Sequence, residues 1–257
     1  MAGIGWMTYG VFRMLVLRDF TIRNIILTVI SFYLIYIIKV YILLAFVPAL
    51  LLWVMFNYLH RIRYRIIRFI IRIAVVGLSA VGFLYAGNKF SDSLGKYSLD
   101  NVAQTAAVTR DWINFVSTQN DESSGYTLGN FDPSIQGMLL KFPAAVNVTL
   151  FRPYLWETKK IITLLAALEA LAFLLVTLKV LIYVGPIRVW KAIVSDPTIQ
   201  FCLIFSLIFA FAVGISTYNF GALSRYRIPC LPFYAFALIL IYYRYNPASK
   251  NLFSLKP

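Results

Sequence analysis

The stretch that decides the fold is IQFCLIFSLIFAFAVGIST, residues 199–217, which contains no charged side chain. A helix of about 20 apolar residues is long enough to cross the hydrocarbon core of a membrane. Two further runs, IILTVISFYLIYII at 25–38 and VYILLAFVPALLLWVMFNYL at 40–59, are similarly apolar. These runs predict an all-α, polytopic helical membrane protein.

The overall composition favours the same class. The chain has 257 residues, of which 61% are hydrophobic and 13% are charged, and its mean hydropathy is +0.77. A soluble domain would need a larger share of polar residues to cover its surface. We therefore expect the lipid bilayer to be the environment of this chain.

The chain is strongly basic, with 24 Lys and Arg against 10 Asp and Glu and a net charge of +14. In a membrane protein such an excess sets topology and contacts anionic lipid, so no nucleic acid is expected as a partner. Cys202 and Cys230 lie in apolar segments, and His60 is the single histidine. Neither a disulfide framework nor a metal site is predicted, and the absence of a phosphate-binding glycine-rich loop predicts no cofactor.

Hydropathy predicts about six membrane spans. They cover residues 24–38, 41–58, 68–86, 161–184, 199–217 and 229–243. The first span is short, and only Lys39 separates it from the second. These two segments therefore form either a tight hairpin or one long helix that is broken near Lys39 or Pro48.

The orientation is predicted from HRIRYRIIRFIIR, residues 60–72, which has five arginines and no acid. Short loops of this kind stay in the cytoplasm. This places both termini inside a multi-pass membrane protein. It also places residues 87–160 outside, and that segment holds seven of the ten acids. The chain thus divides into a membrane region at 1–86, an external helical segment at 87–160 and a second membrane region at 161–257.

The external segment is predicted to be largely helical. Residues 97–117 have apolar side chains at three- and four-residue spacing, which predicts a helix that packs on the membrane domain or docks on a membrane protein partner. Residues 120–130 are typical of a flexible loop. A second helix is expected after Asp132 and Pro133, with a stop or kink at Pro143.

The end of the external segment, from 144 to 157, is expected at the membrane interface. Residues 144–151 are apolar but too short to span. In FRPYLWE, residues 151–157, we expect the aromatic side chains to be interface anchors and Arg152 to point outward.

Two acids are weak candidates for catalysis. Glu169 lies inside a predicted span, roughly 12 Å along the helix from Ile161 at 1.5 Å per residue. Ionisable groups inside a membrane are expensive unless they are paired, so Glu169 is either functional or part of a structural pair. Asp111 is the best external candidate for a general base, and a solvated helix face is the alternative.

Three arginines are the candidate ligand-binding residues. Arg225 and Arg227 stand just before the last span, and Arg152 precedes the fourth. If the backbone before Pro229 is extended, Arg225 and Arg227 project to one side and suit a phosphate or carboxylate. In a helix they would point about 200° apart. The alternative is contact with lipid headgroups combined with ion pairing to Glu157 or Glu169.

The segments NVTLFRPYLWETKKIITLLAALEAL, residues 147–171, and FGALSRYRIPCLPFYAFAL, residues 220–238, carry a family resemblance. They resemble the C-terminal part of polytopic proteins from bacterial exopolysaccharide and O-antigen gene clusters. Those proteins have an FRP-x-x-WE element before one span and an NFG-x-L-x-RY-R/K-IP element before the last. The resemblance covers roughly residues 125–245 and implies a role in envelope glycan handling at the bacterial inner membrane.

The RYR-x-P element is also distantly similar to the last spans of GT-C glycosyltransferases, which act on polyprenyl-linked sugars. Those enzymes place catalytic acids in a first long external loop. Here the external loop precedes the fourth span and has no paired-acid motif.

Three functions are therefore expected, in this order. The first is a non-enzymatic component of bacterial envelope polysaccharide assembly or export that contacts an acidic or lipid-linked glycan. The second is a polymerase or glycosyltransferase that uses a polyprenyl-linked donor. The third is a non-catalytic structural subunit of a larger membrane complex.

Overall fold

The computed structural model describes residues 2–15, 17–59, 125–129, 135–158 and 160–246, with a few single positions between 60 and 124. In this part of the chain every element is a helix, and the one β-type contact is an isolated bridge between Gly125 and Asn219. The predicted all-α class is confirmed for these residues. The chain divides into two compact units, residues 1–97 and 98–257.

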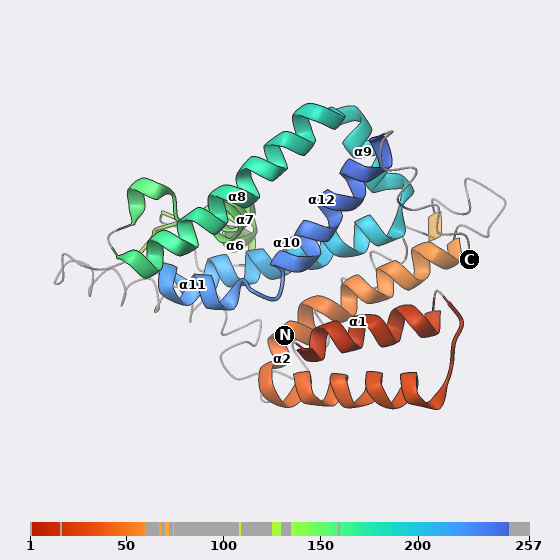
Figure 1. The fold of residues 1–257 in the computed structure, drawn as a ribbon. Coiled ribbons are helices and arrows are strands. Elements are labelled where there is room, and N and C mark those ends of the chain that lie inside the picture. The colour runs from red at the N-terminus through yellow and green to blue at the C-terminus, as the bar shows by residue number, and fades with distance from the viewer. Residues whose placement is uncertain are drawn as a thin grey trace. The chain divides into compact units, whose positions relative to one another are not determined.

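The first unit is built from α1 (Ala2–Leu15) and α2 (Ile22–Leu59), which pack together. α1 buries Ile4, Met7 and Val11, a spacing that lines one face of a helix. Gly10 permits the close approach, because a Cβ there would lie 2.1 Å from Thr28 Oγ1. α1 is thus held along the first half of α2 (Figure 1).

α2 is broken at Lys39, whose φ of −153° and ψ of 76° are not helical. The two halves meet there at a sharp angle (Figure 1). The first half, Ile22–Lys39, is long and apolar enough to cross a membrane, whereas Ile42–Phe56 is a shorter apolar helix. The break expected near Lys39 is therefore confirmed, while Pro48 lies inside the second helix.

The second unit contains the remaining helices. In chain order they are α6 (Ile135–Leu140), α7 (Phe142–Phe151), the short 3-10 helix η2 (Leu155–Glu157), α8 (Ile161–Val184), α9 (Pro186–Ser195), α10 (Pro197–Thr217), α11 (Phe220–Tyr226) and α12 (Leu231–Tyr245). α8 and α10 are each long and apolar enough to cross a membrane. α11 and α12 form a further candidate span that is bent by 64° at the break between them.

The described residues therefore contain three candidate spans, or four if the bent pair is one span. The predicted span at 161–184 matches the bounds of α8, and α10 begins two residues before the predicted 199. The predicted span at 68–86 and the predicted helix at 97–117 lie outside the described residues.

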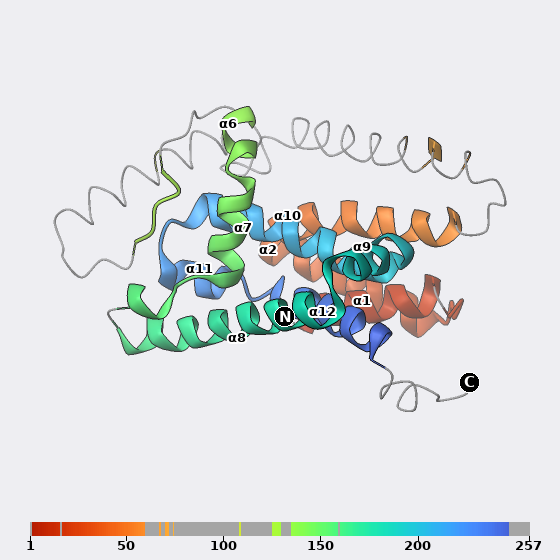
Figure 2. The same ribbon diagram turned by 90° about the horizontal axis from the view of Figure 1, so that it is seen from above.

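α7 crosses α8 and α10 instead of running beside them (Figure 2). Gly214 of α10 lies at this crossing, and a Cβ there would be 2.3 Å from the carbonyl oxygen of Ala145. Thr149 of α7, which is fully buried, donates its hydroxyl to the Ala210 carbonyl at 2.7 Å. The crossing is thus a close backbone contact between α7 and α10 with a hydrogen bond across it.

Candidate functional site

The centre of the site is Arg227, the C-cap residue of α11, whose side chain is fully buried. Its Nη2 donates to Glu169 Oε2 at 2.7 Å and to the Ala166 carbonyl at 2.9 Å, both on α8. Its Nη1 donates to the Arg152 carbonyl at 2.8 Å and, at 3.4 Å, to the Thr149 carbonyl. One guanidinium therefore joins the break before α12 to α8 and to the end of α7.

Glu169 is the partner of this arginine, and its side chain remains 47% exposed. Around it on α8, Ala167 and Ala170 are fully buried. Small side chains at these positions allow neighbouring backbone to approach, which is how Arg227 reaches the Ala166 carbonyl. The ion pair that the sequence offered as one alternative for Glu169 is confirmed.

A second ion pair lies in the turn between α7 and α8. Arg152 donates through Nε to Glu157 Oε2 at 3.0 Å, and its Nη2 contacts Glu157 Oε1, so the pair is bidentate. The Tyr154 amide donates to the same carboxylate at 2.8 Å. The Arg152 side chain is 18% exposed. The expectation that Arg152 points outward is therefore wrong, because the ion pair with Glu157 holds its side chain against the turn at 151–157.

The charge on Glu157 is stabilised locally. Partial burial acts to raise the pKa of this carboxyl, but hydrogen bonds from Arg152 and from the Tyr154 amide outweigh it and hold the pKa below its usual value. Aromatic rings surround the guanidinium of Arg152: its Cζ lies 5.4 Å from the Phe220 ring centre and 5.9 Å from that of Tyr126.

Tyr126 ties the polar segment before α6 to the end of α10. Its amide donates to the Tyr218 carbonyl at 3.1 Å, and its hydroxyl donates to the Gly214 carbonyl at 2.8 Å. The hydroxyl also lies 2.7 Å from Thr217 Oγ1. Burial raises the pKa of Tyr126, so its hydroxyl stays protonated as a donor. The structure describes residues 125–129 of the flexible loop predicted at 120–130. The hydrogen bonds of Tyr126 hold this part of the loop against the end of α10.

Arg225 behaves differently from the other two arginines. It lies in the last turn of α11 with an exposed side chain, and its Nε donates to the Gly221 carbonyl at 3.1 Å. Because α11 is helical to Tyr226, the extended backbone considered for this stretch does not form, and Arg225 and Arg227 do not project to the same side. Among the residues that the structure describes, no acid pairs with Arg225. Asp111 lies outside the described residues.

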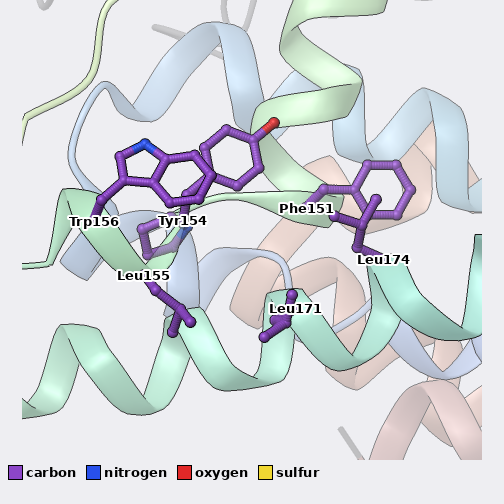
Figure 3. Close-up of a pocket in the computed structure, with 7 residues that line it drawn as sticks. Phe151, Tyr154, Leu155, Trp156, Leu171 and Leu174 are labelled. Carbon is purple, nitrogen blue, oxygen red and sulfur yellow. The ribbon is translucent and has the colours of Figure 1, made fainter.

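An apolar slot of about 100 Å³ lies between the turn and α8. Figure 3 shows the side chains that line it, which come from the end of α7, the following turn and α8: Phe151, Tyr154, Leu155, Trp156, Leu171 and Leu174. Tyr154 and Trp156 stack with ring centres 4.8 Å apart, and Trp156 is 81% exposed. The slot offers a hydrocarbon chain a wholly apolar lining.

Sequence reasoning missed several residues that build the site. Tyr126, Thr149 and Gly214 carried no charge or motif that would have marked them. A signal for Gly214 was its position in an otherwise bulky apolar run, where glycine favours close backbone approach. No group of three or more possible metal ligands occurs in the part of the chain that the structure covers.

Comparison of the chain with protein-family models, with characterised proteins and with solved structures finds no match.

Proposed function

We propose that this protein is an integral inner-membrane component of bacterial envelope polysaccharide assembly or export. In this proposal, its outer face contacts an acidic or lipid-linked glycan through Arg225. The observation that supports the proposal is the convergence of the two elements at 151–157 and 219–229 around α8, with Arg225 left exposed beside them.

The pairing of the charges favours Arg225 as the contact residue. Arg152 and Arg227 are already neutralised by Glu157 and Glu169. Arg225 donates through its Nε to the Gly221 carbonyl, and within the described part of the chain neither of its Nη groups has a hydrogen bond. A guanidinium in this state suits the planar, two-point recognition of a phosphate or carboxylate.

A lipid-linked glycan has chemistry that matches both features of this region. Its phosphate would contact Arg225, and a hydrocarbon chain would contact apolar surfaces such as the slot beside Leu171 and Leu174. Apolar pockets with few polar groups are the usual binding sites for such ligands.

The same pairing favours handling of the glycan over catalysis. A general base must be able to accept a proton from the substrate. Glu157 and Glu169 are each paired with an arginine, so both carboxylates already have a cationic partner. This observation also supports the second candidate function, that of a non-catalytic subunit of a larger membrane complex.

The test is binding of a polyprenyl pyrophosphate to the protein in lipid nanodiscs, measured by native mass spectrometry. We expect Arg225→Gln to weaken binding about tenfold or more, as loss of a charge-assisted hydrogen bond to phosphate implies. Arg244→Gln is the matched control, because it removes an exposed arginine whose partner is Asp196. Unchanged binding by Arg225→Gln would overturn the glycan-contact proposal and favour the structural subunit.

A lipid-free acidic polysaccharide is the second probe. Binding of both probes through Arg225 would indicate that the charge of the ligand is what the protein recognises. Binding of the pyrophosphate alone would assign recognition to the lipid-linked form. If neither probe binds the wild-type protein, the proposal fails.

A further inference from the structure

α9 is held at the end of two candidate spans by very short links. Gly185 alone separates it from α8, and Asp196 alone separates it from α10. The φ of Gly185 is +84°, a conformation that glycine adopts readily and that turns the chain abruptly. Because α8 and α10 are each long and apolar enough to cross a membrane, a helix joined so closely to both lies where they leave the hydrocarbon core.

One side of α9 presents an apolar stripe. Ile187, Trp190 and Val194 follow a spacing of three and four residues, so their side chains lie within about 60° around the helix. They are 71%, 67% and 41% exposed. Ala192, in contrast, is fully buried and faces the helices on which α9 packs. The stripe is therefore not the face that holds α9 in the fold.

Two cations lie beside the stripe. Arg188 and Lys191 are both exposed and are separated by less than one helical turn, so they lie on the same flank. α9 itself contains no acid. The nearest acid, Asp196, is engaged elsewhere: it caps α10 by accepting from the Thr198 amide at 2.8 Å, and it pairs with Arg244 at 3.6 Å.

We propose that α9 is an interfacial lipid-binding helix. Its apolar stripe, formed by Ile187, Trp190 and Val194, inserts among the acyl chains next to the headgroups. Its basic flank, formed by Arg188 and Lys191, binds the phosphates of anionic phospholipids. The arrangement has the features of helices that lie in the plane of the interface: an apolar stripe, a tryptophan at headgroup level and basic residues on the polar flank.

Lipid is the occupant favoured by position and charge. Headgroups surround the ends of every spanning helix, so a helix tethered to two such ends meets them without any further partner. The positive flank of α9 complements an anionic leaflet. This inference does not depend on the proposed glycan contact, which concerns residues on α11.

The first test measures depth by spin labelling, with Cys202 and Cys230 replaced by alanine. Labels are attached to Ile187→Cys and Val194→Cys on the stripe, and to Ser195→Cys on the basic flank. In phosphatidylglycerol–phosphatidylcholine bilayers, we expect the stripe labels to collide mainly with oxygen and the flank label mainly with a water-soluble nickel chelate. Nickel collisions at all three positions, or protection of the stripe from both reagents by a covering protein, would overturn the proposal.

The second test keeps both native cysteines and measures lipid preference. The protein is released from mixed nanodiscs, and its retained phosphatidylglycerol and phosphatidylcholine are compared by native mass spectrometry. Each basic residue near a membrane surface contributes about fivefold to attraction of anionic lipid. We therefore expect Arg188→Gln/Lys191→Gln to lower the preference for phosphatidylglycerol by about 25-fold. The charge-preserving Arg188→Lys/Lys191→Arg keeps it, and a wild-type preference in the double glutamine variant would refute the proposal.

Discussion

Arg227 shows how one residue can join several elements of a membrane protein. Its guanidinium is fully buried, and its four hydrogen bonds go to acceptors on α8 and at the end of α7. Three of those acceptors are backbone carbonyls. No side-chain substitution elsewhere in the chain could replace them. Lysine would keep the charge but lacks the planar fork that serves four acceptors at once.

Arg227→Met is expected to destabilise the protein by about 3 kcal/mol, at the lower end of the range for breaking a buried ion pair because Glu169 is half exposed. Glu169→Gln should cost less, about 1 kcal/mol, since the amide oxygen still accepts from Arg227. Unfolding in mixed detergent micelles measures both. Equal losses for the two variants would contradict a role for the Ala166 and Arg152 carbonyls.

Gly214 is expected to tolerate no side chain. In Gly214→Ala the new Cβ would meet the Ala145 carbonyl at 2.3 Å and Thr149 Oγ1 at 2.7 Å, so α7 must move away from α10. Overpacking of this kind costs about 1–3 kcal/mol. Gly5→Ala is the matched control, because a Cβ there has no neighbour within 4 Å. The midpoint of thermal unfolding should fall for Gly214→Ala alone; equal midpoints would refute the close crossing.

For single residues, the sequence predicted that ion pairs form better than it predicted which residues form them. An acid inside an apolar helix indicated that Glu169 is either functional or part of a structural pair. Three arginines were available, and the choice among them depends on where α11 ends, since one residue changes the direction of a helical side chain by about 100°. Arg152 was placed wrongly because its partner Glu157 lies in the same short turn and bends it inward.

The turn at 151–157 is an element whose stability should depend on pH. The pKa of Glu157 is lowered in the folded protein, so its contribution is complete above the ordinary glutamate pKa of about 4.3 and is lost as the pH falls through the folded value. The difference in unfolding free energy between wild type and Glu157→Gln should therefore shrink as the pH is lowered from 7 to 3. A difference that stays constant over this range would show that the ionised carboxylate does not stabilise the turn.

Helix boundaries were predictable where apolar runs end at charges or special residues. α8 begins after Lys160 and ends at Gly185, and the sequence placed it at the same residues. α10 starts earlier than predicted because Asp196 caps it and Pro197 fits its first turn. α11 was not predicted: seven residues are too few for a periodic pattern, although Asn219 caps the helix through the Gly221 and Ala222 amides.

At the scale of the whole molecule, the prediction is about sidedness. If the chain is oriented with both termini inside, residues at the two ends of α8 lie on opposite sides of the membrane. We expect Thr158→Cys to react with a membrane-impermeant maleimide in intact cells. Ser195→Cys, at the end of α9 between α8 and α10, should react only after permeabilisation. The reverse pattern would invert the topology, and labelling of both positions in intact cells would mean that α8 does not span.

The length of the apolar runs predicted a membrane protein, but it did not predict that some of the candidate spans are short or bent. The segment at 41–58 was predicted as a span, yet the described helix Ile42–Phe56 is shorter than the neighbouring candidates. The last span was predicted at 229–243, which corresponds to α12, whereas the longer candidate span also includes α11, which meets α12 at 64°. Hydropathy is averaged over about 19 residues. It therefore does not reveal the break between α11 and α12, which lies at the buried Arg227.

The hydrogen bonds of Arg227 also impose an order on how the chain enters the membrane. A guanidinium exposed to hydrocarbon costs at least about 2.5 kcal/mol, so the segment that contains α11 and α12 is poorly suited to insert alone. Its acceptors, at residues 149, 152, 166 and 169, are all synthesised earlier. Because these acceptors all precede Arg227 in the chain, we expect α11 and α12 to insert only after α7 and α8 are in the membrane and can receive the guanidinium.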